Sequence, residues 1–409
     1  MGGKYATERL RADTAGIARA AQLLCEGKLV ALPTETVYGL AGNGLDESAV
    51  REIYEVKGRP AIKPLSLMVH GARQMDEYCE DVPQGAKLLA ASFWPGPLTI
   101  VLKSRACVPD IVRAGGSTVG LRCPDHLMTL EALRLAGVPF AAPSANPSGA
   151  PSPKTARAVL DYFDGRIAGV IDGGECGIGT ESTIIDMSAA PYRILRRGAL
   201  PEEEIADALC GGMTLVGITG GTGCGKTTAL RELERMGALI IDCDEVYHEL
   251  LSGGGAMTDE IGERFPGVVS GGRVDRKALG ERVFADAAAL AELNSVTHRH
   301  IGAAVQELLH GWAMKGGTLA AFDAIELVGS GLAAKCRFTV AVTADTQTRV
   351  RRIMERDGID REYALLRVKA QRDNAYFEEN CTYTLKNDGN KEDFIKSFDS
   401  LMEEALKNG

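Results

Sequence analysis

The sequence predicts an α/β protein of two domains, a mixed α/β domain followed by a domain with a parallel sheet and a phosphate-binding loop. A chain of 409 residues is too long for one hydrophobic core. Helix and strand patterns alternate along both halves, as is typical of α/β proteins. A glycine-rich octapeptide at residues 220–227 follows an apolar run in the second half. We place the domains at residues 1–210 and 213–409, because Gly211 and Gly212 separate the two sets of patterns.

In the first half, polar caps followed by apolar periodicity predict helices. Asp13 or Thr14 can cap a helix that ends at Gly27, and Asp46 can cap one that reaches Val56. Short apolar runs bounded by turn residues predict strands. We expect further helices at residues 125–136 and 201–209, and strands at residues 29–32, 65–69, 98–102, 118–121, 140–142, 183–186 and 192–195.

The composition excludes several classes of protein. The net charge is −9, and neither half has the excess of basic residues expected of a nucleic-acid-binding domain. The ten cysteines are scattered without a C-x-x-C pair, which favours a reducing cytosol over a disulfide framework. No apolar run is long enough to span a bilayer, and no signal peptide opens the sequence. We therefore expect a cytoplasmic protein that does not bind membranes.

The octapeptide fits the phosphate-binding pattern G-x-x-x-x-G-K-[ST]. A predicted strand at residues 215–218 precedes it, and a predicted helix at residues 229–235 follows it. Backbone N–H groups of such a loop surround phosphate oxygens at the positive end of the helix. Lys226 would reach the terminal phosphates of ATP, and the Thr227 hydroxyl would bind Mg²⁺. The predicted ATP contacts of this loop are Gly223, Cys224, Gly225, Lys226, Thr227 and Thr228.

Two acidic residues follow later strands of this half, at residues 238–241 and 318–322. The carboxyl edge of a parallel sheet is where α/β proteins bind ligands. Asp244 there could take a proton from an attacking hydroxyl, and Asp323 could join the Mg²⁺ shell. A lone Asp after a strand is, however, more often a helix cap. Four arginines of one helical segment could close over the transferring phosphoryl group, or could form a solvated face: Arg349, Arg351, Arg352 and Arg356.

From residue 215 onward the sequence resembles dephospho-coenzyme A kinases. The resemblance implies transfer of the ATP γ-phosphoryl group to the 3′-hydroxyl of dephospho-CoA. It implies that Asp244 is the base, that the arginine segment is a lid, and that Arg352 and Arg356 contact ATP. The motifs that carry it are residues 217–221, 241–244, 274–280, 293–298, 330–332 and 356–358, together with Gln371 and residues 387–389.

The sequence departs from this family at three places on the acceptor side. Gly329 stands where the family usually has an acidic residue, and Arg299 stands where it usually has Pro. The segment 325–328, expected as a strand, reads Ile-Glu-Leu-Val instead of Pro-Leu-Leu-Phe. A phosphate-loop kinase of another small acceptor is therefore an alternative for the second half.

Polar segments of the first half adjoin the ends of its predicted elements. They are residues 33–40, 57–60, 143–146 and 181–183. Lys, Arg and hydroxyl side chains in such a set suit a triphosphate and a carboxylate, since the arginine fork binds both. We find no nucleophile–base pair and no acidic cluster with metal-ligand spacing, so Mg²⁺ would be held mainly by the phosphates of ATP. These residues alone indicate only an anion-binding domain.

Over residues 10–205 the sequence resembles the threonylcarbamoyl-AMP synthase family, whose fold is YrdC-like. The resemblance rests on residues 33–40, 57–59, 93–99, 143–149, 179–183 and 195–198. It implies that L-threonine, bicarbonate and ATP form threonylcarbamoyl-adenylate and pyrophosphate, for modification of an adenosine in tRNA. It implies catalytic roles for Lys57 and Arg59. The implied threonine contacts are Thr34, His70, Arg122 and Ser182, and the implied ATP contacts are Lys57, Arg59, Thr118, Ser144, Asn146, Ser152 and Arg196.

These inferences predict a bifunctional enzyme with two separate ATP sites. Its partners would be L-threonine, bicarbonate, ATP and dephospho-CoA, with a threonylcarbamoyl transferase complex downstream and no stable binding of tRNA. Two alternatives concern the first half. An RNA-binding module is disfavoured by the nearly neutral charge of this half. Carbamoyl transfer in hydrogenase maturation is disfavoured because acylphosphatase and zinc-finger segments are missing.

Overall fold

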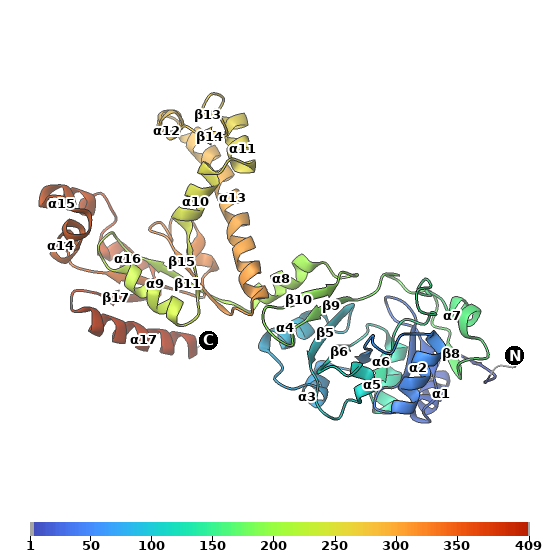
Figure 1. Ribbon diagram of the computed structural model, residues 1–409. Coiled ribbons are helices and arrows are strands. Elements are labelled where there is room, and N and C mark those ends of the chain that lie inside the picture. Colours follow the sequence, from blue (N-terminus) through green and yellow to red (C-terminus); the bar gives the residue numbers. More distant parts are fainter. Residues whose placement is uncertain (1–3, 408–409) are drawn as a thin grey trace. The chain divides into compact units, whose positions relative to one another are not determined.

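The computed structural model describes residues 4–407. The chain forms two compact units. Unit 1 runs to Gly212 and includes Met314–Gly316, and unit 2 takes Met213–Ala313 and the chain from Gly317. Unit 1 has a mixed sheet and unit 2 an all-parallel sheet, which confirms the predicted fold class (Figure 1).

Unit 1 is built on a ten-stranded sheet with the order β1-β8-β2-β3-β7-β4-β6-β5-β9-β10. The sheet contains both parallel pairs, such as β4 with β6, and antiparallel pairs, such as β5 with β6. The strands are β1 Glu8–Leu10, β2 Val30–Leu32, β3 Gly39–Asn43, β4 Ser66–Met68, β5 Leu98–Lys103, β6 Thr118–Arg122, β7 Phe140–Ala141, β8 Gly169–Ile171, β9 Thr183–Asp186 and β10 Arg193–Arg196.

The first two helices of unit 1 begin where the sequence provides caps. The Asp13 carboxylate accepts a hydrogen bond from the Gly16 N–H and caps α1, and Asp46 caps α2 in the same way. Both predictions are confirmed. The helices are α1 Thr14–Cys25, α2 Glu47–Lys57, α3 Met75–Tyr78, α4 Gln84–Phe93, α5 Asp110–Arg113, α6 Leu127–Ala136, α7 Ala156–Phe163 and α8 Glu202–Gly211.

Three strands of unit 1 were not predicted. β1 and β8 contain only three residues each, and β3 has the sequence Gly-Leu-Ala-Gly-Asn. The residues of β3 lack the β-branched and aromatic side chains by which strands are usually identified. β3 is nevertheless buried, because it lies inside the sheet between β2 and β7.

Unit 2 is built on a five-stranded parallel sheet with the order β12-β15-β11-β16-β17. Its strands are β11 Thr214–Thr219, β12 Leu239–Asp242, β15 Leu319–Asp323, β16 Phe338–Thr343 and β17 Tyr383–Lys386. Its helices are α9 Lys226–Arg235, α10 Cys243–Ser252, α11 Ala256–Arg264, α12 Arg276–Val283, α13 Ala287–Met314, α14 Thr346–Asp357, α15 Arg361–Lys369, α16 Asn374–Asn380 and α17 Lys391–Lys407.

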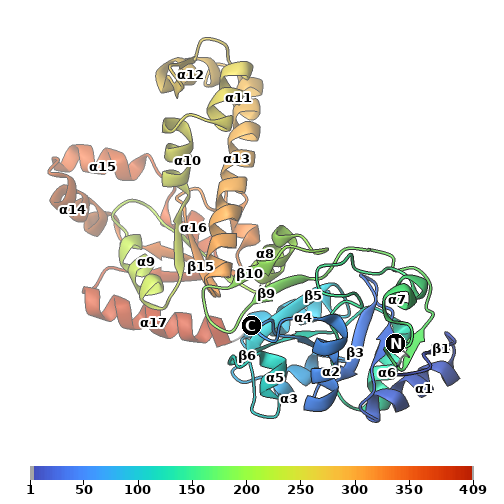
Figure 2. The ribbon, with the colours of Figure 1, turned by 45° about the vertical axis from the view of Figure 1, so that its right-hand side comes forward.

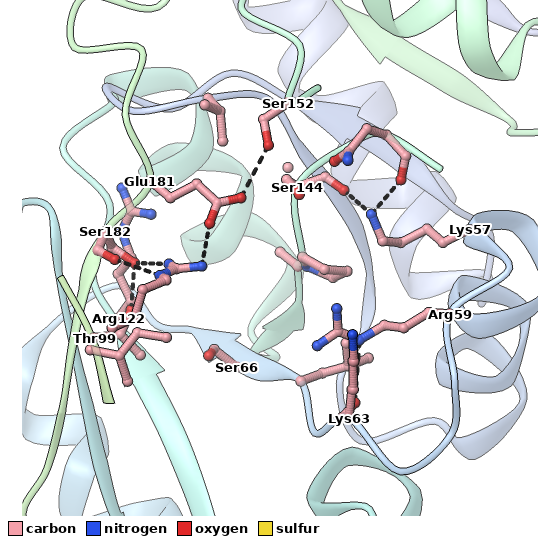
Figure 3. A pocket seen from close by; sticks show the side chains of 18 of the residues that line it. Lys57, Arg59, Lys63, Ser66, Thr99, Arg122, Ser144, Ser152, Glu181 and Ser182 are labelled. Atoms are coloured by element: carbon pink, nitrogen blue, oxygen red, sulfur yellow. Dashed lines mark hydrogen bonds and ion pairs between the residues drawn. The ribbon is translucent and has the colours of Figure 1, made fainter. Parts of the chain in front are cut away.

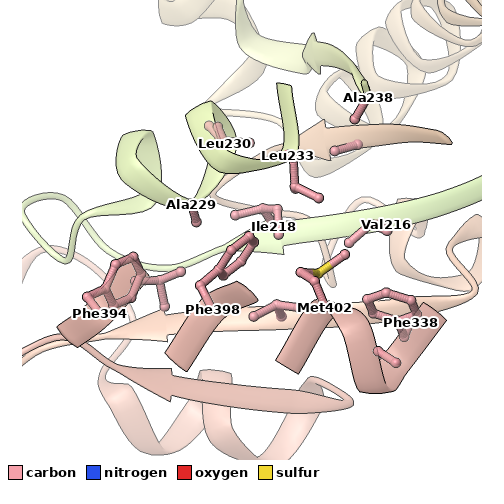
Figure 4. Close-up of a cluster of buried hydrophobic side chains, with 14 of the residues drawn as sticks. Val216, Ile218, Ala229, Leu230, Leu233, Ala238, Phe338, Phe394, Phe398 and Met402 are labelled. Atoms are coloured by element: carbon pink, nitrogen blue, oxygen red, sulfur yellow. The ribbon is translucent and has the colours of Figure 1, made fainter. Parts of the chain in front are cut away.

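One face of this sheet is covered by α9 and α17. Alternate residues of the central strand β11, Val216 and Ile218, are fully buried there. Leu233 of α9 and Phe398 and Met402 of α17 pack in the same apolar cluster (Figure 4). Because strand side chains alternate between faces, this packing fixes the register of β11 and thereby the position of the loop that follows it.

Helices α10 to α13 form an arm that extends from the carboxyl edge of the sheet (Figure 1 and Figure 2). The arm has its own apolar cluster, which includes Met257, Ile261 and Val296, and a short hairpin of β13 Val269–Ser270 and β14 Arg273–Val274. The expected strand at residues 325–328 is wrong. These residues form turns between β15 and the 3₁₀ helix Leu332–Lys335.

Candidate functional site

Unit 1 contains a cavity of about 410 Å³ whose lining is strongly cationic. Lys57, Arg59 and Lys63 line one side, and Glu181 and Ser182 lie across from them (Figure 3). The lining includes five cationic side chains and one carboxylate, which are Lys57, Arg59, Lys63, Arg122, Arg196 and Glu181. A cavity of this charge is suited to a polyanionic ligand.

Lys57 is the last residue of α2, and Gly58 ends the helix in the left-handed conformation, with φ of 58°. The Lys57 Nζ donates hydrogen bonds to the backbone oxygens of Ser144 and Asn146, the latter at 2.5 Å. Only 3% of the residue is exposed. Burial, with a smaller contribution from Arg59, lowers the pKa of Lys57 to about 8. Lys57 is thus a fixed cation that can lose its proton at moderately alkaline pH.

Arg59 lies in the loop after α2. Its guanidinium donates to the backbone oxygens of Lys63 and Pro64, at 3.2 and 2.9 Å, so the loop orients it. The Asn146 amide nitrogen donates to the oxygens of Pro147 and Ala150, which leaves its buried Oδ1 without a partner among the described residues. Arg59, a cation, and Asn146, which offers this acceptor oxygen, both line the cavity.

Two arginines at strand ends complete the charge of the cavity. Arg122 ends β6 and donates to Glu35 at 2.6 Å and to the Thr36 hydroxyl at 2.8 Å. Arg196 ends β10; its Nε and Nη2 donate to the backbone oxygen and the hydroxyl of Ser182, at 3.0 and 3.1 Å. Burial lowers the pKa of the Arg196 guanidinium.

The fold brings most of the predicted residues to this one cavity and leaves two outside its lining. His70 is exposed, and Thr118 starts β6 opposite Lys103 of β5. The roles expected for these two residues stay predictions. The predicted residues that line the cavity are Thr34, Lys57, Arg59, Arg122, Ser144, Asn146, Ser152, Ser182 and Arg196.

The lining also includes polar residues that were not predicted as contacts, among them Lys63, Ser66, Thr99 and Glu181. The sequence offered a signal for Glu181, since it lies inside the polar segment 181–183. Its partners, however, come from other segments. Glu181 accepts a hydrogen bond from the Ser152 hydroxyl at 3.0 Å and forms an ion pair with Arg196.

In unit 2, the phosphate-binding loop connects β11 to α9, as its motif requires. Gly225 caps α9 with φ of 103°, a conformation that other residues rarely adopt. A Cβ at this position would also lie 2.1 Å from the Asn387 amide nitrogen. Lys226 is the first residue of α9, and its Nζ lies 2.7 Å from the Asp323 carboxylate at the end of β15.

The acidic residues at the edge of the sheet, Asp242 and Asp244, differ in what their side chains contact. Asp242 lies opposite Asp323 in the β12–β15 register, and its carboxylate caps α10 by accepting from the N–H groups of Asp244 and Glu245. The cap is therefore Asp242, and the Asp244 side chain is not used for it. Partial burial raises the pKa of Asp244, and the negative charge of Asp242 raises it by a smaller amount. A raised pKa is favourable for a carboxylate that has to accept a proton.

A magnesium ion fits this edge only as part of a complex with phosphates. Thr227 on α9 and Asp323 supply oxygen ligands of the kind that Mg²⁺ prefers. Within residues 4–407 no group of three or more His, Cys, Asp or Glu side chains is arranged to hold a metal ion. The protein therefore offers a partial shell that the phosphates of ATP would complete.

The arginines of α14 differ in what they contact. Arg349 is buried and donates to the backbone oxygen of Thr222, in the loop, and to Gln371 at 2.7 Å. Gln371 in turn accepts from the Thr222 N–H and donates to its hydroxyl, both at 2.8 Å. Arg349 and Gln371 thus hold the loop from the side of the predicted lid. Gln371 belongs to a family motif but was not predicted as a site residue.

Arg352 and Arg356 were predicted to contact ATP. Arg352 lies beside the loop, with Nη1 at 3.4 Å from the backbone oxygens of Gly223 and Cys224. Arg356 is exposed and pairs with Asp357 at the end of α14. Asn387, which was not predicted as a site residue, donates to the Cys224 oxygen at 2.9 Å.

The residues that depart from the family on the acceptor side have the following surroundings. Arg299 of α13 pairs with Glu260 of α11 at 2.6 Å, inside the arm. Gly329 lies in the turns after β15, where a Cβ would approach the Glu326 carboxylate to 2.9 Å. Neither residue leaves an unpaired charge at the sheet edge.

Two family models match the chain. The model of the Sua5, YciO and YrdC family, described as telomere recombination, matches residues 22–198. The model of the dephospho-CoA kinase family matches residues 214–393.

Curated relatives resemble the first half. The threonylcarbamoyl-AMP synthase of Pyrococcus abyssi is 50% identical over 186 residues, which cover 46% of this chain and 55% of that protein. The synthase of Bacillus subtilis is 45% identical over 203 residues, covering 49% of this chain and 58% of that protein. The synthase of Pseudomonas syringae is 37% identical over 182 residues, covering 44% of this chain and 97% of that protein. The chain thus spans little more than half the length of the first two relatives.

Solved structures are similar to this chain as well. The crystal structure of Pyrococcus abyssi Sua5 complexed with L-threonine is 31% identical, covers 85% of this chain and 96% of that chain, and gives a TM-score of 0.48. The dephospho-CoA kinase from Campylobacter jejuni is 22% identical, covers 47% of this chain and 98% of that chain, and gives a TM-score of 0.35. Because the Pseudomonas relative is matched almost end to end, the chain belongs to the threonylcarbamoyl-AMP synthase family through its first half, and its second half contains a domain that the dephospho-CoA kinase model matches.

Proposed function

We propose that unit 1 joins L-threonine, bicarbonate and ATP to form threonylcarbamoyl-adenylate and pyrophosphate. The observation that carries this proposal is the cavity of unit 1, whose lining includes five cationic side chains and one carboxylate. Such a cavity can hold a triphosphate and a carboxylate together. Relatives named threonylcarbamoyl-AMP synthase, up to 50% identical in this half, support the choice of substrates.

The chemistry of this reaction needs positioning and charge rather than a nucleophile from the protein. The threonine amine adds to CO₂ with loss of a proton, or to bicarbonate with loss of water, and forms a carbamate. A carbamate oxygen then attacks the α-phosphorus of ATP while pyrophosphate leaves. Arg122, with Thr34 and Ser182, would bind threonine. Lys57 and Arg59 would neutralise the charge that shifts to the leaving pyrophosphate. Both are held by backbone oxygens, so little reorganisation is needed when the charge develops.

We propose that unit 2 transfers the γ-phosphoryl group of ATP to the 3′-hydroxyl of dephospho-CoA. The loop N–H groups would bind the phosphates, and Lys226 would leave Asp323 for the terminal phosphates. Asp244 would accept the proton of the attacking hydroxyl. Mg²⁺, held by Thr227, Asp323 and the phosphates of ATP, would supply further neutralisation of charge.

The product of unit 1 would serve the threonylcarbamoyl modification of an adenosine in tRNA through a separate transferase complex. We place both reactions in the cytoplasm. Among the described helices, none is long and apolar enough to cross a bilayer.

The test uses the purified full chain in two assays. With ATP and bicarbonate, pyrophosphate should form only when L-threonine is added. With ATP, dephospho-CoA should yield CoA and ADP, whereas other nucleosides and small alcohols should not be phosphorylated. Tight RNA binding without threonine-dependent pyrophosphate would contradict the first assignment. A preference for another acceptor would contradict the second.

A further inference from the structure

The only carboxylate that lines the cavity of unit 1, within the part of the chain that the structure describes, is that of Glu181. Its two oxygens have different partners. One accepts a hydrogen bond from the Ser152 hydroxyl at 3.0 Å, and the other forms the ion pair with Nη1 of Arg196. Ser152 and Arg196 are both residues expected to contact ATP. A single acidic side chain therefore engages two of the groups that are expected to contact ATP.

Arg196 is oriented for an anion independently of Glu181. Its Nε and Nη2 are fixed by Ser182, at 3.0 and 3.1 Å, and Ser182 is itself bonded to the Thr99 hydroxyl at 2.9 Å. Only Nη1 faces Glu181. If Glu181 moved away, Nη1 would stay in place and could bind a phosphate oxygen with the same geometry.

A second arginine–glutamate pair in unit 1 differs from this one in its burial. Arg122 and Glu35 are almost buried, with side chains 9% and 12% exposed, and Glu35 also accepts from the Asp125 N–H. Arg196 and Glu181 are 40% and 38% exposed. Breaking a buried pair leaves an uncompensated charge, whereas a half-exposed pair contributes little and opens readily.

We propose that Glu181 is an internal competitor for phosphate: it occupies Arg196 and Ser152 in the free cavity, gives way to the phosphates of the nucleotide, and by returning to them promotes the release of pyrophosphate. The proposal rests on the proposed function of unit 1. It makes Glu181 a positioning residue that acts through Arg196 and Ser152. Removing its charge should tighten the binding of pyrophosphate, which the loss of a purely structural contact would not do.

The test measures pyrophosphate binding by calorimetry, with inorganic pyrophosphate as the probe. The full chain carries Lys226→Ala to weaken phosphate binding at the loop of unit 2. Adding Glu181→Gln keeps a hydrogen-bonding side chain but removes the charge. It should lower the dissociation constant for pyrophosphate about two- to fivefold, the range expected for one half-exposed ion pair. The gain should shrink at high salt, because salt screens such pairs.

Glu202→Gln is the matched control. Glu202 pairs at 3.0 Å with Arg197, the residue that follows Arg196 in the sequence. Neither Glu202 nor Arg197 lines the cavity. This variant should bind pyrophosphate as the Lys226→Ala chain does. If Glu181→Gln misfolds, Glu181→Asp shortens the reach of the carboxylate and should give a smaller gain in affinity.

Unchanged or weaker pyrophosphate binding in Glu181→Gln would overturn the proposal, since a residue that holds the bound ligand would show that result. The binding assay does not depend on turnover, so absence of threonine-dependent activity in the wild-type chain would count against the proposed function alone. In an active enzyme, Glu181→Gln should lower KM for ATP while kcat stays equal or falls, because pyrophosphate leaves more slowly.

Discussion

The two proposed nucleotide sites of this chain are suited to phosphate by different means. In unit 1, cations from segments between Lys57 and Arg196 converge on one cavity. In unit 2, one continuous loop presents backbone N–H groups, with Lys226 as its only cationic side chain. The first design depends on side-chain charges that can be removed one at a time. The second concentrates the function in a few adjacent residues, so a single substitution there should have the larger effect.

The largest effect should follow Lys226→Ala. Phosphorylation of dephospho-CoA should be abolished, because no other side chain of the loop carries positive charge to the terminal phosphates. Threonine-dependent pyrophosphate release should remain at the wild-type level. Both activities are measured on the same preparation. Parallel loss of both would show that the chain does not contain two independent sites.

Asp244→Asn should come next. General-base assistance is worth about 10²–10⁴-fold, so kcat of the kinase should fall within this range. Affinity for ATP should change little, because the residue is expected to face the acceptor. Asp242→Asn is a useful companion, since Asp242 caps α10 and its loss should reduce stability. Near-normal turnover of Asp244→Asn would exclude the base role.

Arg59→Ala and Ser144→Ala should each slow threonine-dependent pyrophosphate release while sparing the kinase. Losing one charge-assisted contact costs roughly 1.5–3 kcal/mol, which corresponds to about one to two decades in rate at fixed substrate. The comparison is pyrophosphate formed with and without threonine. Activity like the wild type in both variants would place the substrate site elsewhere in unit 1.

The smallest effect concerns pH. With its pKa lowered to about 8, Lys57 is charged below this pH and neutral above it. If its charge binds ATP, kcat/KM of the synthase reaction should decline as the pH rises through about 8. Lys57→Arg should remove this decline, because arginine keeps its charge. Bound phosphates favour the charged form of Lys57 and so raise its pKa. The decline in kcat should therefore occur at a higher pH than the decline in kcat/KM. A decline that persists in Lys57→Arg would assign it to another group.

The same comparison explains what the sequence could and could not predict. The loop at residues 220–227 and the caps Asp13 and Asp46 act through near neighbours, so local pattern was sufficient. The cavity of unit 1 was identified through family motifs, because its residues come from distant segments. The competing position of Glu181 depends on where Ser152 and Arg196 meet in space, and no local pattern contains that information. His70 and Thr118 lie outside the lining of the cavity, and the roles that the motifs imply for them stay predictions.

The parallel sheet of unit 2 has a consequence for how the chain acquires its structure during synthesis. Residue 214 of β11 pairs with residue 319 of β15, and β11 also pairs with β16, which begins at Phe338. Contacts between such distant segments form slowly, because a long loop has to close first. The apolar central strand β11 is also translated well before β15 and β16, its two neighbours in the sheet. Until then Val216 and Ile218 have no sheet to join, and the nascent second half is exposed to aggregation at the very segment that later carries its phosphate loop.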